Sequence, residues 1–202
     1  MKITCKNIWM TNCYLVEGEN GAVVIDPGYK REAILDFLKE NENKERLILL
    51  THGHFDHIGG AEYLRSQTGV KIGIGALDEP ALSDNELNCA VSFKRTLPPF
   101  SADYLYNDGD RISVGDIEFE VIACPGHTVG GISLLCEGNL FSGDTLFRES
   151  VGMINVNDIK LRDLEKSIKR LYTLPDDTAV LPGHGEPSTV GHEKNYNPFV
   201  RI

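Results

Sequence analysis

Residues 51–60 read THGHFDHIGG and directly follow the apolar run Arg46–Leu50, which predicts a buried strand. The potential metal ligands in this stretch are His52, His54, Asp56 and His57. Residues two apart on a strand face the same way, so the first two histidines can reach one ion together. The turn that follows lets the aspartate and the third histidine face a second ion. Imidazoles combined with a carboxylate favour zinc or iron over calcium, so the stretch predicts a site for divalent metal ions.

Three further candidate ligands stand in the same context, each beside glycine at the end of an expected strand. They are His127 in CPGHT, Asp144 in SGDT and His184 in PGHG. A lone histidine beside a glycine is more often a surface or core residue than a ligand. Together with the first cluster, however, these residues make seven candidates, which are too many for one four-coordinate ion. The set therefore predicts two metal ions.

Several nearby residues have competing interpretations. Asp26, which ends VVID, is either a turn-capping carboxylate or a partner that orients a ligand histidine. Cys124 is interpreted as a buried small hydrophobe, with a metal ligand or an oxidation target as the alternatives. His192 is interpreted as a solvated residue. Arg148 and Lys94 are either solvated charges or contacts for an anionic substrate.

The two halves of the chain follow the same order of elements. The first runs through a hairpin at Gly18–Gly21, an aspartate, a helix over 30–41, a strand and a histidine. The second repeats this order with strands over 132–136 and 140–144, a helix over 161–172 and a strand over 178–181. Another helix is expected from about Ile58 to Gln67, and the irregular segment 75–106 is expected to consist of helical turns and loop. This organisation predicts two related layers whose sheets pair inside and whose helices lie outside.

Composition limits the class of protein. The 202 residues are 41% hydrophobic and lack a linker, which favours one domain over residues 1–202. A net charge of -10 argues against nucleic acid or an anionic membrane as a partner. The start has no signal-peptide pattern, and no apolar run is long enough to span a membrane. Five widely spaced cysteines fit reduced thiols in a cytoplasmic protein.

Five pieces of the sequence together resemble the metallo-β-lactamase superfamily. They are VVIDPG around Asp26, THGHFDHIGG, CPGHTVGG around His127, FSGDTLF around Asp144 and LPGHGEPST around His184. Within that superfamily, LFRESVG, LYTLPDDTAVLPGHGEPST and the ending EKNYNPFV are most similar to the small glyoxalase II-like hydrolases. The resemblance implies an α/β (α+β) fold, a four-layer αββα sandwich, which agrees with the internal repeat.

The resemblance also implies a role for each candidate ligand. His52, His54 and His127 would bind the first metal, and Asp56, His57 and His184 the second. Asp144 would bridge the two ions, which are expected to be zinc, with iron or manganese as alternatives. A hydroxide bridging two ions about 3.5–4 Å apart would attack the substrate carbonyl. Asp56 could receive protons, and Asp144 would hold the pair together, so these two carboxylates are the expected catalytic residues.

The expected substrate is a small molecule, a thioester such as a glutathione thioester. Two departures from the family pattern argue against a glutathione thioester as the substrate. The chain has no C-terminal helical domain of the kind that binds glutathione in full-length glyoxalase II. In addition, Gly152-Met153-Ile154-Asn155 stands where many relatives have Gly-Arg-x-Asp. The alternatives are a hydrolase of another ester or a phosphodiester and a single-iron persulfide dioxygenase. A non-enzymatic binding module is disfavoured because no ligand is missing. The identity of the substrate and the oligomeric state stay open.

Overall fold

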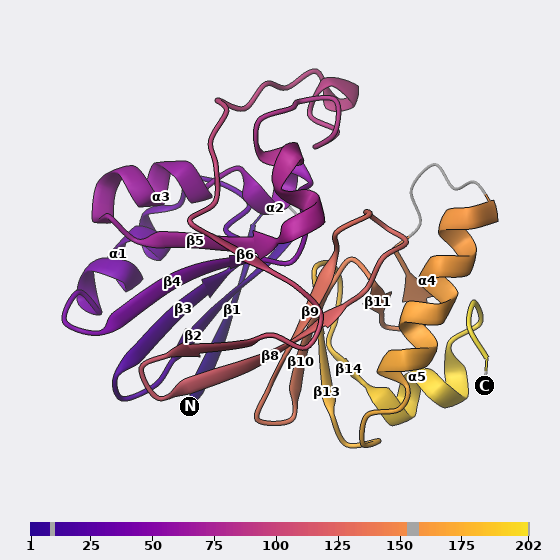
Figure 1. The fold of residues 1–202 in the computed structure, drawn as a ribbon. Helices are drawn as coiled ribbons and strands as arrows, with labels where there is room; N and C mark the ends of the chain where they lie inside the picture. The colour runs from indigo at the N-terminus through magenta and orange to yellow at the C-terminus, as the bar shows by residue number, and fades with distance from the viewer. Residues whose placement is uncertain (9–10, 153–157, 202) are drawn as a thin grey trace.

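Two β-sheets face each other at the centre of the molecule, with helices on both outer sides (Figure 1). The structure is a computed structural model, and it describes residues 1–8, 11–152 and 158–201. Each sheet has six strands, in the orders β1-β2-β3-β4-β5-β6 and β14-β13-β10-β9-β8-β7. The expected αββα sandwich is therefore confirmed.

The first sheet and its helices come from the first half of the chain. Its strands are β1 Lys2–Ile8, β2 Thr11–Glu17, β3 Gly21–Ile25, β4 Glu45–Leu50, β5 Lys71–Gly75 and β6 Tyr104–Tyr106. The helices are α1 Glu32–Glu40, α2 Phe55–Ile58 and α3 Ala61–Thr68, with the 3-10 helices η1 Ala76–Leu82 and η2 Val91–Phe93. Strands β3 to β6 run parallel, so the loops after β3 and β4 leave the same edge of the sheet.

The second sheet comes from the second half. Its strands are β7 Arg111–Val114, β8 Ile117–Ala123, β9 Ile132–Cys136, β10 Asn139–Gly143, β13 Ala179–Pro182 and β14 Ser188–Thr189, beside the small hairpin β11 Leu146–Phe147 and β12 Ser150–Val151. Its helices are α4 Asp158–Leu171 and α5 Val190–Tyr196. Strands β10 and β13 are parallel, so their carboxyl ends also meet at one edge.

Three apolar clusters hold these layers together. The cluster between the sheets includes Val23, Leu49, Phe119 and Phe141, all at most 1% exposed. A second cluster packs α1 and α3 on the first sheet, and a third packs α4 on the second sheet. Burying apolar area contributes about 25 cal/mol per Å², so these interfaces supply the main stabilisation of the fold. They leave one edge of the sandwich to polar loops.

Some predicted elements need correction. The helix expected from about Ile58 to Gln67 is α3, which begins three residues later at Ala61, and the short helix α2 that precedes it was not expected. The segment 75–106, expected to consist of helical turns and loop, contains the 3-10 helices η1 and η2 as expected and, in addition, the strand β6. Between Pro187 and Pro198 the chain forms the short helix α5, which the sequence did not predict.

Three further expectations from the sequence concern the stretch 152–155, membrane spans and the cysteines. In the stretch Gly152-Met153-Ile154-Asn155, the last three residues lie outside the described part of the chain. Within the described ranges, no helix is both long enough and apolar enough to cross a bilayer. None of the five cysteines, all of which lie in the described ranges, forms a disulfide, as the sequence predicts.

Candidate metal centre

The candidate ligands lie where strands of both sheets end. His52 and His54 follow β4, and His57 lies in the short helix α2 that comes next. From the second sheet, His127 follows β8 and Asp144 follows β10, while His184 follows β13. The two sheets are joined here, since Asn12 in β2 donates its backbone N–H to the carbonyl of Gly183 at 2.7 Å. The packing of two sheets thus gathers residues that are up to 132 positions apart, counting from 52 to 184.

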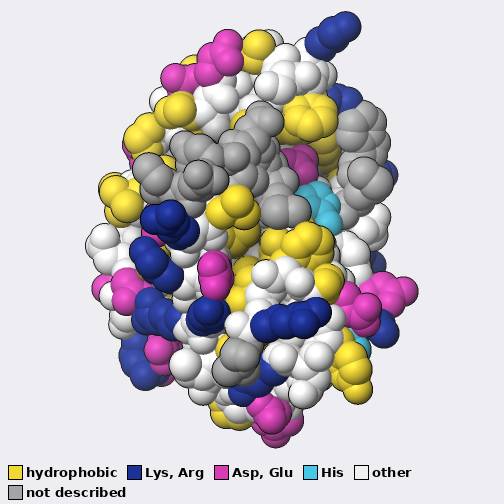
Figure 2. All heavy atoms as spheres, turned by 90° about the vertical axis from the view of Figure 1, so that its right-hand side faces the viewer, with side chains coloured by type: hydrophobic (Ala, Val, Ile, Leu, Met, Phe, Trp, Pro, Cys, Tyr) yellow, Lys and Arg dark blue, Asp and Glu magenta, His cyan; other side chains and the backbone are white. Residues whose placement is uncertain are grey.

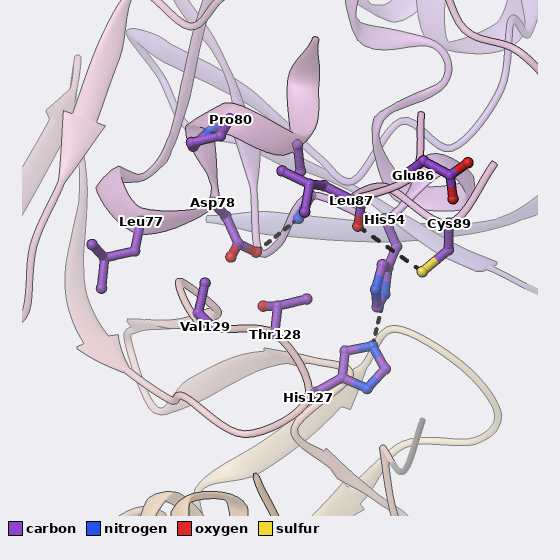
Figure 3. Close-up of a pocket in the computed structure, with 12 residues that line it drawn as sticks. His54, Leu77, Asp78, Pro80, Glu86, Leu87, Cys89, His127, Thr128 and Val129 are labelled. Carbon is purple, nitrogen blue, oxygen red and sulfur yellow. Dashed lines mark hydrogen bonds between the residues drawn. The ribbon is translucent and has the colours of Figure 1, made fainter. Parts of the chain in front are cut away.

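Three histidines form the first group. The Nδ1 atom of His54 lies 3.0 Å from Nε2 of His52 and 2.9 Å from Nε2 of His127. All three side chains are buried, and together they could hold a metal ion. The contact between His54 and His127 is visible in the close-up of the adjoining pocket (Figure 3).

Asp56, His57 and His184 form a second group that could also hold an ion. The Nε2 atoms of His57 and His184 are 3.3 Å apart, and Oδ2 of Asp56 lies 3.4 Å from Nε2 of His184. Thr11 donates its hydroxyl to the same Asp56 oxygen at 3.2 Å. The start of β2 therefore contacts this group directly.

Asp144 lies between the two groups. Its Oδ2 atom is 3.4 Å from Nε2 of His127 and 3.3 Å from Nε2 of His184, and its Oδ1 atom is 3.4 Å from Nε2 of His57. The side chain is 8% exposed, and Oδ1 is a buried oxygen without a hydrogen-bond partner. Because a buried carboxylate oxygen without a hydrogen bond is costly, a cation bound beside this atom would stabilise it.

The second ring nitrogens of three of these histidines contact other groups. Nδ1 of His127 donates to the carbonyl of Gly152 at 3.0 Å, and Nδ1 of His57 lies 2.9 Å from Oδ2 of Asp26. Thr51 donates its hydroxyl to Asp26, so it accepts from Nδ1 of His52 at 3.1 Å. These contacts fix the rings with the opposite nitrogen facing the centre.

Asp26 also appears in a third possible group with His52 and His57. Its two oxygens already accept the Thr51 N–H at 2.8 Å, the Thr51 hydroxyl and the His57 ring. A carboxylate engaged in this way orients a ligand and does not serve as one. Of the two interpretations of Asp26, the structure supports the orienting role.

The electrostatics differ between the two groups. Burial lowers the pKa of His54 to about 3, and burial also lowers the pKa of His52 and His127. Burial opposes the charged form of His57, but the carboxylates of Asp144 and Asp26 outweigh it and raise the pKa of this histidine to about 9. Burial would raise the pKa of Asp144, yet the charge of His57 and a hydrogen bond from His184 lower it.

The donor set of the first group fits a cation. Because the Nδ1 atoms of His52 and His127 carry protons that they donate outward, their Nε2 atoms present lone pairs toward Nδ1 of His54. One proton on His54 could satisfy only one of these two contacts. Three nitrogen donors and a nearby carboxylate match the ligand preference of zinc and of other borderline divalent ions.

Three positioning contacts were not predicted from the sequence. Asn12 donates its side-chain amide to the carbonyls of Pro182 and Gly185, which flank His184. Thr11 contacts Asp56, as described above. Asp78, within η1, is 3% exposed and accepts backbone N–H groups from the loops that carry the first group of histidines. A polar residue in a segment without a metal-binding pattern gives no local signal of such a role.

A pocket of about 470 Å³ opens beside His54 and His127 (Figure 3). Its walls come from η1, from the loop after it and from the loop after His127. The apolar lining residues are Leu77, Pro80, Ala81, Leu87 and Val129. Among the described residues that line it there is no Lys or Arg, while Glu86 and Asp78 are acidic. The volume is that of a small-molecule site.

Other candidates lie outside the centre. Cys124 is buried beside the hydroxyl of Ser133 at 3.3 Å, and burial raises its pKa to about 11, so it belongs to the core as the sequence suggests. His192 lies 2.9 Å from a Glu149 oxygen.

The two candidate cations also lie away from the pocket. Arg148 pairs with Glu186 at 2.8 Å, and Lys94 is exposed at the end of η2. Neither residue lines the pocket.

Comparison with known proteins agrees with this geometry. Residues 7–184 match the family model of the metallo-beta-lactamase superfamily. A protein of Aquifex aeolicus is 38% identical over 194 residues, which cover 94% of this chain and 91% of that one. The hydroxyacylglutathione hydrolase GloC of Haemophilus influenzae is 32% identical over 195 residues, covering 94% and 92%.

Solved structures are also similar. BLEG-1, a B3 metallo-beta-lactamase, superposes with a TM-score of 0.90 at 33% identity, covering 98% of this chain and 99% of that one. TTHA1623, solved in a di-iron-bound form, superposes with a TM-score of 0.84 at 33% identity, covering 99% and 100%.

Proposed function

Because the chain belongs to the metallo-β-lactamase superfamily, a superfamily of metal-dependent enzymes, we propose that it is a binuclear hydrolase of small-molecule thioesters. The observation that carries the proposal is the position of Asp144. Its Oδ2 atom lies 3.4 Å from His127 of the first group and 3.3 Å from His184 of the second, and its buried Oδ1 atom, which has no hydrogen bond, faces His57 of the second group. A single carboxylate so placed can serve two ions at once.

The ligand roles follow from the two groups. His52, His54 and His127 would hold one ion, Asp56, His57 and His184 would hold the other, and Asp144 would bridge them. Two divalent ions bound there would lower the pKa of a water, so that it could act as the nucleophile, and would polarise the substrate carbonyl. Zinc fits the donors, and iron is supported by the di-iron form of TTHA1623.

The protein's own residues have three tasks in this reaction. Asp26, Thr51 and the Gly152 carbonyl keep the imidazoles in their orientation. Asp56, whose side chain is 27% exposed, lies at the solvent side of the second group. Burial opposes its charged form, but a hydrogen bond from His184 and the charge of His57 lower its pKa, so it serves as an anionic ligand and the expected proton uptake is disfavoured. The apolar pocket walls keep water away from part of the substrate. No Ser or Cys nucleophile is needed.

Thioesters are favoured over oxygen esters and phosphodiesters for a chemical reason. A thiol ionises near pH 8.5, so its departure needs little help from an acid. The described pocket lining offers no Lys or Arg to bind a phosphate or a carboxylate. The name of the GloC relative, a hydroxyacylglutathione hydrolase, supports the same reaction class.

The lining also argues against tight recognition of glutathione, because the tripeptide carries two carboxylates. Cations do gather on another face, over α4 (Figure 2). There Lys166 pairs with Asp163, Lys169 with Glu165 and Arg170 with Asp108. None of these residues lines the pocket. We therefore propose an uncharged or weakly charged acyl thioester as the substrate.

The test is release of free thiol from S-lactoylglutathione and from acyl N-acetylcysteamine thioesters by zinc- or iron-reconstituted protein. A His184→Ala variant serves as the control for metal-dependent turnover. Thiol release that the variant loses supports the proposal. If no thioester is cleaved, and oxygen is consumed with glutathione persulfide, the protein is an oxidoreductase and the proposal is wrong.

A further inference from the structure

Asp78 joins two loops that come from different sheets. Its Oδ2 atom accepts the N–H of Gly53 at 2.9 Å, and its Oδ1 atom accepts the N–H of Gly130 at 2.6 Å. Gly53 lies between His52 and His54, and Gly130 comes three residues after His127. One buried carboxylate thus connects both segments that carry the first group of histidines.

The backbone of η1 lies tightly against both loops. A Cβ atom at Gly53 would lie 2.5 Å from Cβ of Ala81, and one at Gly130 would lie 2.3 Å from the backbone nitrogen of Asp78. Real side chains do not tolerate such distances, so glycine is required at both positions. In Figure 3 Asp78 lies on the pocket wall above the two histidines, with a hydrogen bond toward the loop of His54.

We infer that Asp78 is a positioning residue, which sets the spacing between the His52–His54 loop and His127 and thereby the affinity of the first metal site. This inference rests on the proposed metal site but not on the thioester substrate. Asp78 does not itself belong to either group of ligands. It acts through the backbone, because both of its partners are amides of the ligand-bearing loops.

The chemistry of the contact makes a simple substitution informative. A carboxylate offers two acceptor oxygens, whereas the carboxamide of asparagine offers one oxygen and an NH₂ group. In Asp78→Asn one backbone N–H would face another donor, although the volume of the side chain barely changes. The loop concerned would move away from η1, and the three imidazole nitrogens would no longer converge.

The experiment isolates each metal site. A His184→Ala background retains the intact first group, and a His127→Ala background retains the intact second group. Zinc affinity is measured in each by competition with a chromophoric chelator. In the His184→Ala background we expect Asp78→Asn to lower the zinc affinity about 10- to 100-fold, as is typical when a group that orients metal ligands is lost. In the His127→Ala background the affinity should change less than about threefold.

Asp116→Asn is the matched control. The Asp116 carboxylate also accepts two backbone N–H groups, from Glu19 at 2.9 Å and Asn20 at 2.7 Å, but at the hairpin between β2 and β3. This variant should leave zinc affinity unchanged in both backgrounds. Asp78→Glu, which keeps both acceptors on a longer side chain, should recover part of the lost affinity.

Each outcome decides the inference. A loss confined to the first-site background and partly restored by glutamate supports it. Equal losses in both backgrounds, a loss no larger than in Asp116→Asn, or no recovery with glutamate overturns it. If circular dichroism shows that Asp78→Asn does not fold, Asp78→Glu decides alone: a selective, smaller first-site loss supports the inference, and equal losses overturn it. If the first-site background without an Asp78 substitution binds no zinc, the proposed metal site itself is wrong.

Discussion

The Nδ1 atom of His57 lies 2.9 Å from Oδ2 of Asp26, and both side chains are at least 97% buried. The other ring nitrogen of His57 faces Asp144 at 3.4 Å. This histidine therefore has a carboxylate on each side, and they raise its pKa to about 9. The histidines of the first group have no such arrangement, and their pKa values are lowered by burial.

This contrast predicts that the two metal sites depend differently on pH. At neutral pH His57 is protonated in the metal-free protein, so an ion must displace a proton from its Nε2 atom. Zinc affinity of the second site should rise with pH from 6.5 toward 9, by up to about tenfold per pH unit. The first site, whose histidines are already neutral, should change little over this range.

Calorimetric titration of zinc in the His127→Ala and His184→Ala backgrounds, in buffers of different ionisation enthalpy, measures the protons released at each site. Equal proton release at pH 7 would contradict the assignment.

Metal content gives a second prediction. After reconstitution with zinc or iron the protein should hold about two ions per chain, because two separate groups of ligands are present. Elemental analysis against protein concentration checks this number. A content that stays at one ion under saturating metal would instead favour the single-iron oxidoreductase.

Ligand substitutions should abolish turnover without unfolding the protein. His54→Ala removes the nitrogen that faces both other histidines, and Asp144→Asn leaves one oxygen where two are needed. We expect thioester hydrolysis to fall at least about 100-fold in each, while the far-UV circular dichroism spectrum stays unchanged. His192→Ala is the control, since this histidine contacts Glu149 outside the centre. Wild-type activity in either ligand variant would mean that the ligands are assigned wrongly.

Truncation of the thiol portion tests the substrate class. Replacing glutathione by N-acetylcysteamine in a thioester removes both carboxylates, which have no Lys or Arg partner among the described lining residues. Binding energy that is absent cannot be used in catalysis, so kcat/KM should change less than about tenfold. A loss of about 100-fold, which corresponds to roughly 2.7 kcal/mol, would reveal a dedicated glutathione site.

Adding a cation to the pocket wall should create a preference for the glutathione thioester over the truncated thioester. Val129 is 63% exposed and lines the pocket, so Val129→Lys places an ammonium group where a substrate carboxylate can reach it. An exposed ion pair of about 0.2–1 kcal/mol should raise kcat/KM for a glutathione thioester by at most about fivefold, and less for the truncated substrate. Leu105→Lys on strand β6, 51% exposed, adds the same charge elsewhere. Equal gains in both variants would point to a general charge effect.

The residues of the candidate metal centre could be predicted from the sequence because their signal is local. His52, His54 and His57 follow a buried strand at spacings that fix their directions, and His127 and His184 each stand beside a glycine at a strand end. The repeat of hairpin, helix and strand likewise predicted the paired sheets. These features depend on a few neighbouring residues.

What the sequence did not reveal depends on contacts across the fold. Strand β1 is mostly exposed and shows no apolar alternation, and α5 has only seven residues between two prolines. Asp78 and Asn12 are ordinary polar residues in their own segments, and only the packing of η1 and β2 brings them to the ligand loops. Such positioning contacts have no sequence pattern of their own.

The first group of ligands also has a mechanical consequence, because His54 and His127 come from different sheets and are separated by 73 positions. A metal ion bound to both would cross-link the chain as a disulfide does and would restrict the unfolded ensemble. For a loop of this length the entropy of closure is worth roughly 4 kcal/mol, a large fraction of the stability of an ordinary domain. Chelation would then lower the stability of the fold and, at the same time, remove the ions needed for hydrolysis.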